Sequence, residues 1–241
     1  MADISFVIPC YNEKGNLSAL IKAIRETADS LRISHEIVII DDGSTDGSWE
    51  IIKEQAAADP HIRGERFAAN RGKTAAMCAG FRAARGRVFV TMDADLQNDP
   101  RDLPRLLDAL QTCDCACGSR VKSRRAGASF LRAISSRIAN GVRNRLSGDN
   151  ISDAGCFYRA FRRECVERIR FFEGGHRFLS TLIKMEGFRV TEVPVRNNPR
   201  FSGQAHYGVW NRLFKSSADL LAVRWMKKRV IRYHITEEVG I

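Results

Sequence analysis

Two aspartates separated by a single residue, Asp93 and Asp95, directly follow the apolar run Arg87–Met92. Carboxylate oxygens at this spacing can bind one divalent cation, because Mg2+ prefers oxygen ligands and shares its coordination sphere with substrate phosphates. The side-chain oxygen of Gln97 could add a ligand, and the metal would stabilise a diphosphate leaving group as a Lewis acid. The structural alternative is a turn and a helix cap, since the motif precedes Asn98-Asp99-Pro100.

Two further polar clusters follow apolar runs nearer the N-terminus, at residues 11–13 (YNE) and 41–47 (DDGSTDG). The acidic pair Asp41 and Asp42 can accept hydrogen bonds from a ribose or a base edge, and the two glycines allow the backbone to approach a ligand closely. The serine, threonine and third aspartate of this segment are also good helix N-caps, so a turn leading into a helix is the alternative. The chain has no G-x-G-x-x-G motif, which removes the main support for a dinucleotide-binding Rossmann domain.

The elements that must position these clusters alternate between short apolar strands and amphipathic helices. The expected strands are Ile4–Ile8 (ended by Pro9), Glu36–Ile40, Arg87–Met92 and Cys113–Gly118. The expected helices are Asn16–Leu31, Ser48–Ala58, Lys73–Ala84 and Asp102–Gln111. This alternation predicts an α/β fold with a mostly parallel central sheet and helices on both faces. Ligands of such sheets bind beyond the carboxyl ends of the strands, so the three polar clusters should converge on one edge.

The second half of the chain is strongly basic. No acidic residue occurs between Arg120 and Arg145, where apolar residues recur at helical spacing, and a second amphipathic pattern covers Val209–Met226. The formal net charge of +11 indicates a polyanionic partner: nucleic acid, an anionic membrane surface or phosphate-bearing substrates. Nucleic acid is disfavoured, because the basic stretch contains only Phe130 as a stacking residue.

The apolar runs fall short of the roughly 20 residues that cross a bilayer, so we expect no transmembrane helices. The N-terminus does not resemble a signal peptide, which predicts a cytoplasmic protein with reduced thiols, peripheral at the inner face of the membrane. Cys113, Cys115 and Cys117 should share one buried face of a strand, and a metal site there is disfavoured. His176 and Arg177 either support the site or are structural.

Seven segments, in order along nearly the whole chain, resemble the motifs of a family 2 glycosyltransferase with the GT-A fold. More narrowly, the chain is similar to the polyprenyl- or dolichol-phosphate mannosyltransferases and their bacterial relatives. The matching segments are VIPCYNE (7–13), VIIDDGSTDGS (38–48), NRGKTAA (70–76), MDADLQNDP (92–100), GSR (118–120), EGGHRFL (173–179) and RFSGQAHYG (200–208). The resemblance implies a glycosyltransferase domain over residues 1–208, with a nucleotide-sugar half (1–118) and an acceptor half (119–208). An amphipathic basic segment follows over residues 209–241.

The resemblance also assigns residues to roles. The nucleotide-sugar would contact Pro9, Tyr11, Asn12, Glu13, Asp41, Asp42, Lys73, Asp93 and Arg120. The metal, Mg2+ or Mn2+, would bind Asp93, Asp95 and Gln97. The acceptor phosphate would contact Arg132, Arg200 and His206, and the catalytic set would be Asp93, Asp95 and Asp153. A phosphate acceptor is already largely ionised at neutral pH, so we expect Asp153 to organise the sugar site rather than to act as an obligatory base.

Two departures from the family pattern bear on function. His206 stands where relatives commonly have a lysine, which makes one acceptor cation dependent on pH. Leu221 stands where polysaccharide synthases have a glutamine, which argues against a processive polymerase. The function implied is transfer of mannose from GDP-mannose onto a polyprenyl phosphate at the membrane surface, with a membrane-protein partner or a homo-oligomer as further options. The alternative is transfer from a UDP-sugar, of the glucose or N-acetylhexosamine type, onto undecaprenyl phosphate or a polysaccharide hydroxyl.

Overall fold

The computed structural model describes residues 3–124, 141, 144–146, 150–199, 209–231, 236–237 and 239. Within them, one seven-stranded sheet has the order β3-β2-β1-β4-β6-β5-β7. Its strands are β1 (Ile4–Cys10), β2 (His35–Asp41), β3 (Ile62–Arg66), β4 (Val88–Thr91), β5 (Cys115–Ser119), β6 (Arg159–Arg162) and β7 (Val190–Pro194). Only β6 runs antiparallel to its neighbours in this sheet. The sheet is therefore mostly parallel, as the sequence predicts.

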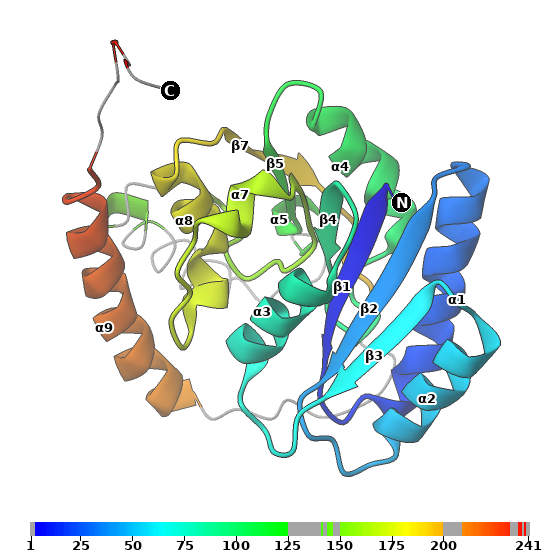
Figure 1. Cartoon of the computed structure of the whole chain (residues 1–241). Coiled ribbons are helices and arrows are strands. Elements are labelled where there is room, and N and C mark those ends of the chain that lie inside the picture. The colour runs from blue at the N-terminus through cyan, green and yellow to red at the C-terminus, as the bar shows by residue number, and fades with distance from the viewer. Residues whose placement is uncertain are drawn as a thin grey trace.

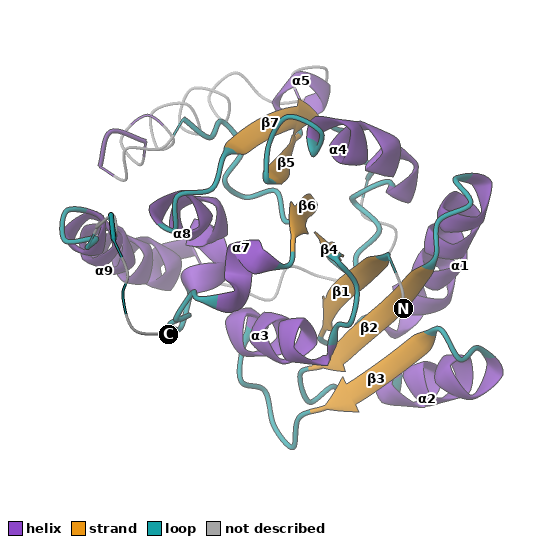
Figure 2. Ribbon diagram, turned by 45° about the horizontal axis from the view of Figure 1, so that its top comes forward, coloured by secondary structure: helices purple, strands orange, loops and turns teal. Residues whose placement is uncertain are grey.

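Helices cover both faces of the sheet (Figures 1 and 2). One layer holds α1 (Lys14–Ser30), α2 (Ser48–Ala58), the short helix η1 (Pro100–Asp102) and α4 (Leu103–Ala109). The other holds α3 (Lys73–Ala83), α7 (Glu164–Glu167), η2 (Gly175–Phe178) and α8 (Leu179–Met185). Alternate residues of each strand pack into opposite layers, because side chains of a strand alternate between faces. In β2, Ile37 and Ile39 pack with α1, whereas Val38 and Ile40 pack with α3.

The antiparallel strand β6 decides which segments meet at the edge where a ligand would bind. The carboxyl ends of β1, β2, β4 and β5 lie at one edge of the sheet, and β6 begins there because it runs the other way. Arg159, the first residue of β6, pairs with Thr91 at the end of β4 and with Cys117 near the end of β5. Residues just before Arg159 therefore join the residues just after β1, β2, β4 and β5.

The strand predicted to stop before Pro9 instead continues through it to Cys10. Proline is tolerated here because its missing N–H faces the β4 side, where pairing of β1 with β4 has already ended at Val7. The opposite side still pairs normally, since the Asp42 N–H donates to the Cys10 carbonyl at 2.8 Å. The prediction was wrong by two residues because proline blocks only one of the two pairing edges.

The expected common face of three cysteines is also wrong. Cys115 and Cys117 lie in the core on the α3 side, with their sulfur atoms 3.8 Å apart. Cys113 precedes β5 and packs on the opposite side, where its thiol donates to the Ala109 carbonyl at the end of α4. The strand begins at Cys115, so strand alternation does not apply to Cys113.

The C-terminal helix α9 (Val209–Lys227) packs beside η2 and α8 (Figure 1). Its Val223 is fully buried against Phe178 and Leu182, and Asp219 forms an ion pair with Arg177 of η2 at 2.6 Å. Of the basic helix predicted over 120–145, the described residues include α5 (Val121–Arg124), and most of the rest lies outside them. No helix in the described part of the chain is long and apolar enough to span a membrane.

Candidate active site at the carboxyl edge of the sheet

The loops that follow β1 and β2 are joined by reciprocal hydrogen bonds. The Asn12 N–H donates to Ser44 Oγ at 2.9 Å, and the Thr45 N–H donates to Asn12 Oδ1 at 2.9 Å. The Glu13 N–H donates to Ser48 Oγ at 2.9 Å. Of the three residues considered as caps of α2, Ser44 instead holds Asn12, whereas Asp46 Oδ1 accepts from the Ser48 N–H at 2.9 Å, although the N-cap residue itself is Gly47. Side chains of residues 44–48 therefore fix the YNE loop, whose contact with a nucleotide-sugar stays a prediction.

The two aspartates at the end of β2 hold different partners. Asp41 is fully buried, accepts from the Ser44 N–H at 3.1 Å and forms an ion pair with Arg66 at 3.1 Å. Asp42 accepts from the Arg71 N–H at 2.6 Å and the Gly72 N–H at 2.9 Å, each on a different oxygen. Burial raises the pKa of Asp42 above its usual value, although both N–H bonds oppose the shift. Asp42 therefore fixes the loop before α3, and the contact of either aspartate with a nucleotide stays a prediction.

Gly43 allows the loop after β2 to approach the loop before α3. Its φ of +76° lies in the left-handed region, and a Cβ at this position would meet the Ala69 carbonyl carbon at 2.8 Å. Real Cβ atoms do not come so close to backbone, so only glycine fits. The glycine that the sequence analysis associated with ligand approach here serves the approach of the 69–72 backbone.

The acidic turn Asp93–Gln97 follows β4 at the centre of this edge. Asp93 forms an ion pair with Lys73 at the start of α3, and both side chains are 29% exposed. Asp95 is nearly buried and accepts from the Gln97 N–H at 3.1 Å. Leu96, between them, adopts a φ of +60°, which costs a non-glycine residue of order 1 kcal/mol or more. The turn therefore carries backbone strain directly after the second of its two carboxylates.

This turn fits a divalent cation by the chemistry of its donors. Two carboxylates supply hard oxygen ligands, and an ammonium group already lies against one of them, so the position attracts positive charge. No third His, Cys, Asp or Glu joins them among the described residues. A bound metal would therefore complete its coordination with substrate phosphate and water, as Mg2+ commonly does.

Arg120 and Asp153 form a buried, two-pronged ion pair beside this turn. Arg120 Nε donates to Asp153 Oδ2 at 2.9 Å, a second guanidinium nitrogen donates to Oδ1 at 3.2 Å, and each residue is 5% exposed. Burial acts to lower the pKa of Arg120, while Asp153 and the more distant charge of Asp93 raise it above its usual value. Glu192 of β7 accepts from the N–H groups of Ser152 and Asp153 at 2.9 and 3.0 Å. Arg120 and Asp153, both predicted as site residues, therefore lie beside the acidic turn. Both carboxylate oxygens of Asp153 accept hydrogen bonds from Arg120.

A half-buried histidine connects α3 to the segment before α8. His176 Nδ1 and Thr74 Oγ1 are 2.7 Å apart, and the Gly174 N–H also donates to Thr74 Oγ1 at 3.2 Å. Burial, and then the positive charges of Lys73, Arg177 and Arg159, lower the pKa of His176 to about 3. The ring is therefore neutral at physiological pH and holds Thr74, the neighbour of Lys73. This contact agrees with the second of the two interpretations given to His176, a structural histidine, and a direct role in the site stays a prediction.

Sequence reasoning missed two side chains at this edge. Phe157 lies before β6, with its ring centroid 3.7 Å from Lys73 Nζ. Arg159 is 2% exposed and donates to the carbonyls of His176 and Ala154 at 3.3 and 3.4 Å. An arginine that begins a four-residue strand gives no local pattern from which its burial could be predicted.

The predicted acceptor residues Arg132, Arg200 and His206 lie outside the described residues. The segment that leads towards Arg200 is described as far as Pro199, and the Asn198 N–H donates to the Gln97 carbonyl at 3.0 Å. Arg196 pairs with Asp102 at 3.0 Å and with Asp99 at 3.3 Å. The chain therefore reaches the acidic turn immediately before the predicted acceptor motif.

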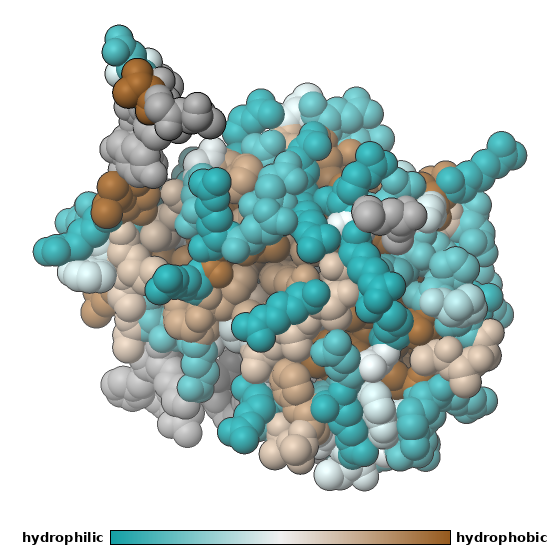
Figure 3. Space-filling model, viewed as in Figure 1, coloured by the Kyte–Doolittle hydropathy of each residue, from teal (hydrophilic) through white to brown (hydrophobic). Residues whose placement is uncertain are grey.

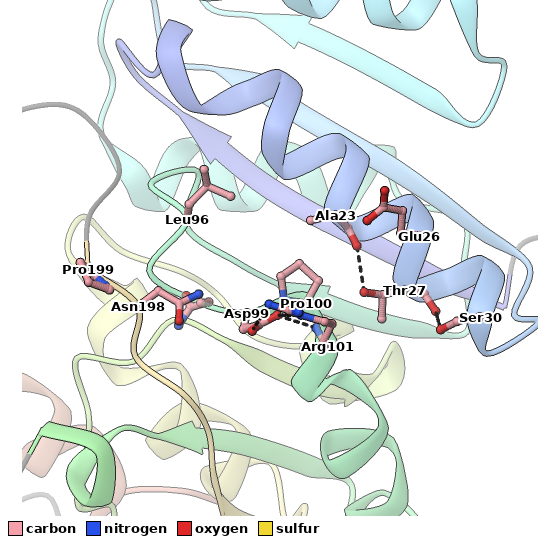
Figure 4. A pocket seen from close by; sticks show the side chains of 11 residues that line it. Ala23, Glu26, Thr27, Ser30, Leu96, Asp99, Pro100, Arg101, Asn198 and Pro199 are labelled. Atoms are coloured by element: carbon pink, nitrogen blue, oxygen red, sulfur yellow. Dashed lines mark hydrogen bonds and ion pairs between the residues drawn. The ribbon is translucent and has the colours of Figure 1, made fainter. Parts of the chain in front are cut away.

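A separate cavity of about 580 Å3 lies between α1 and the loop after the acidic turn (Figure 4). Its wall includes Leu96 and Pro100, whereas Asp93 and Asp95 are not among its lining residues. The Thr27 hydroxyl donates within α1, and Arg101 bonds to Asp99. Asn98 also lines the cavity, and its buried Oδ1 has no hydrogen-bond partner among the described residues, so the cavity adjoins the acidic turn with one acceptor unsatisfied.

Comparison with solved structures identifies the fold. Glucosyl-3-phosphoglycerate synthase from Mycobacterium tuberculosis, crystallised with Mn2+, uridine diphosphate and phosphoglyceric acid, superposes with a TM-score of 0.68 at 19% identity. The alignment covers 96% of this chain and 80% of that one. A mannosyltransferase from Pyrobaculum calidifontis, in complex with GDP-Man and Mn2+, superposes with a TM-score of 0.59 at 19% identity, covering 94% and 74%. The chain has the GT-A fold of nucleotide-sugar-dependent glycosyltransferases.

The glycosyl transferase family 2 model matches residues 5–170, so the chain belongs to this family, as predicted. It is 34% identical over 207 residues to undecaprenyl-phosphate 4-deoxy-4-formamido-L-arabinose transferase of Aeromonas hydrophila, covering 86% of this chain and 63% of that protein. It is 32% identical over 231 residues to dodecaprenyl-phosphate galacturonate synthase of Rhizobium johnstonii, covering 94% and 68%. The chain thus spans just under two thirds of the length of the Aeromonas relative.

The neutral His176 predicts a specific pH dependence of stability. Below about pH 6.5 the unfolded histidine takes up a proton that the folded one, with a pKa of about 3, does not. The unfolded state then binds more protons, so stability falls as pH falls through this window. His176→Gln removes this contribution, which amounts to at most about 1.4 kcal/mol per pH unit. Urea unfolding between pH 6.5 and 4.5 should give a shallower loss for the variant.

Urea unfolding at pH 7.5, where the ring is neutral in both states, measures any loss of stability caused by poorer packing of glutamine. Subtracting that loss leaves the part of the stability difference that arises from protonation of the unfolded histidine. Parallel stability curves for the two proteins below pH 6.5 would show that folded His176 takes up the proton, which contradicts the neutral ring described above.

Proposed function

We propose that this chain transfers a sugar from a nucleotide-sugar onto a polyprenyl phosphate. The observation that carries the proposal is the acidic turn Asp93–Gln97 at the centre of the edge, between Lys73 and the buried Arg120. Carboxylates that favour a metal beside cations that favour phosphate suit a diphosphate-bearing donor. The acceptor class is supported by the Aeromonas and Rhizobium relatives, which are named for undecaprenyl and dodecaprenyl phosphate.

For the donor, the same relatives favour the alternative given in the sequence analysis over mannose. They are named for a 4-deoxy-4-formamido-L-arabinose and for galacturonate, neither of which is mannose. The solved neighbours include one complex with uridine diphosphate and one with GDP-Man, so the fold accommodates both bases. We therefore propose that the donor carries a modified pentose or hexose. A thermal-shift screen of nucleoside diphosphates with Mg2+ or Mn2+ is the direct way to identify its base.

In the proposed reaction, the residues of this chain chiefly position and neutralise charge. Asp93 and Asp95 would hold Mg2+ or Mn2+, which when bound offsets the charge of the departing diphosphate. Arg120 is held by both oxygens of Asp153, so its position beside the acidic turn would be set before the donor binds. A lipid monophosphate, with a second pKa near 6, is already largely ionised at neutral pH and can attack the anomeric carbon directly. The proposed reaction therefore needs no general base, consistent with the full engagement of Asp153.

Asp95→Ala is expected to abolish transfer to polyprenyl phosphate, because it removes one of two carboxylates that would hold the metal. EDTA should have the same effect, reversed by excess Mg2+ or Mn2+. Radiolabelled sugar incorporated into an organic-soluble lipid measures both. Asp108→Ala, which removes an exposed carboxylate of α4, should leave transfer unchanged. Retained turnover of Asp95→Ala, or activity indifferent to EDTA, would exclude the metal role.

Asp153→Asn separates the two acceptor classes. The variant leaves buried Arg120 without its counter-charge, so stability should fall by about 3 kcal/mol. At saturating donor, turnover with polyprenyl phosphate should nevertheless survive, with the main loss in donor KM. Removing a true general base typically costs 10²-fold or more in kcat. A kcat loss of that order with unchanged donor KM, in a variant shown folded by circular dichroism, would favour a hydroxyl acceptor.

A peripheral membrane position is proposed from the outer side of α9. Leu221 and Trp225 are each 59% exposed, although neighbouring Val223 is buried. Arg229 lies over the Trp225 ring at 4.9 Å, and Lys227 and Lys228 are also exposed. Hydrophobic side chains appear beside hydrophilic ones along the α9 edge in Figure 3. An exposed apolar stripe bordered by cations suits the interface of an anionic bilayer, which is where a polyprenyl phosphate resides.

Replacing Leu221 and Trp225 together by serine should weaken binding to vesicles that contain anionic lipid by at least tenfold, since each side chain contributes roughly 1.5–3 kcal/mol when buried. Flotation with phosphatidylglycerol-containing vesicles measures this. Ala222→Ser, on the same exposed side of α9, should bind like the parent chain. Binding that is equal for neutral and anionic vesicles, or insensitive to the double substitution, would contradict this position.

A further inference from the structure

Lys73 occupies a prepared position between an anion and an aromatic ring. Its ammonium group forms the ion pair with Asp93 Oδ1, and the same nitrogen lies 3.7 Å from the centroid of Phe157. A cation over an aromatic face is attracted to the ring electrons. The two contacts together hold the ammonium on the first of the two carboxylates assigned to the metal.

The surrounding backbone fixes both sides of this position. Lys73 begins α3 directly after Gly72, whose N–H is bound by Asp42 at 2.9 Å, and its other neighbour Thr74 is held by His176. Opposite, the Thr91 hydroxyl donates to the Phe157 carbonyl at 2.6 Å, so the ring stays beside the end of β4 and Asp93. The backbone on both sides of Lys73 and the backbone of Phe157 are therefore each held by hydrogen bonds.

An ammonium and a divalent cation cannot both lie against the same carboxylate without strong mutual repulsion. A metal that binds Asp93 must therefore displace Lys73 from Oδ1. The displaced ammonium remains tethered within reach of the site and is best placed against a new anion. In the proposed reaction the anion that arrives with the metal is the diphosphate of the donor.

We propose that Lys73 competes with the divalent cation for Asp93 and transfers to the donor diphosphate when metal and donor bind together. This inference rests on the metal and donor proposed above. Lys73 then makes metal binding weak in the absence of nucleotide and strengthens it when nucleotide is present. Because such coupling is reciprocal, the metal increases nucleotide affinity by the same factor. Lys73 thus lowers the affinity of the site for the metal when no donor is bound.

The test measures Mn2+ binding by titration calorimetry, with and without a nucleoside diphosphate, in the parent chain and in Lys73→Met. Methionine keeps an unbranched stem against Phe157 and removes the charge. Without nucleotide, Lys73→Met should bind Mn2+ about fivefold or more tightly than the parent, and the increase in affinity caused by nucleotide should shrink by a similar factor, the lower range of typical couplings. Lys73→Gln should behave alike.

Lys53→Met is the matched control, because Lys53 is an exposed lysine of α2 paired only loosely with Glu50 at 3.8 Å, and its Mn2+ binding should equal that of the parent. If the parent binds Mn2+ with nucleotide but Lys73→Met binds it no more tightly without nucleotide, the competition is refuted while the metal site stands. If none of the proteins binds Mn2+ under either condition, the metal role itself fails, and this inference fails with it.

Discussion

Every loop at the carboxyl edge of the sheet has backbone N–H groups that the strand ladders no longer satisfy, and a half-buried N–H needs an acceptor. In this chain the acceptors come from neighbouring loops. Asp42 binds the N–H groups of Arg71 and Gly72, Ser44 binds that of Asn12, and Glu192 binds that of Asp153. The loops therefore position one another. The loops around the acidic turn are each held by a side chain from a neighbouring segment. Asp42, which the family motif assigns to the nucleotide, thus also holds a neighbouring loop in place.

Backbone strain concentrates in the same frame. Three non-glycine residues of the described chain have positive φ, and two of them, Asn12 and Leu96, lie in the YNE loop and the acidic turn. Such conformations persist only where the surroundings determine them, as the paired bonds between Asn12 and the 44–45 segment do. The strain at Leu96 places Asp95 back against the Gln97 N–H. The backbone of this edge is thus held by hydrogen bonds between neighbouring loops.

The fold was predictable where burial imposes a pattern. Unbroken apolar runs marked β1, β2 and β4, and the parallel sheet placed their polar ends together. By contrast β3 (IRGER) and β6 (RAFR) carry charged residues, and were missed because their pairing is decided by distant partners. The same holds for the site. Asp93 and Asp95 were found from their spacing, whereas the Thr74–His176 contact joins residues 102 positions apart and leaves no local trace. Likewise, the ion pair between Asp153 and Arg120 is seen only in the folded structure and not in the sequence.

The Arg120–Asp153 pair has a consequence for how such a protein can diversify. It joins residues 33 positions apart, directly after β5 and shortly before β6, and the hydroxyls of Ser119 and Ser152 meet beside it at 3.0 Å. The end of β5 and the residues that lead into β6 are therefore joined directly by side-chain contacts. Lengthening a closed loop costs little, about 0.6 kcal/mol for each doubling. Chains that differ in the length of the segment between Arg120 and Asp153 can therefore keep the same junction between β5 and β6, provided that both partners of the ion pair are retained.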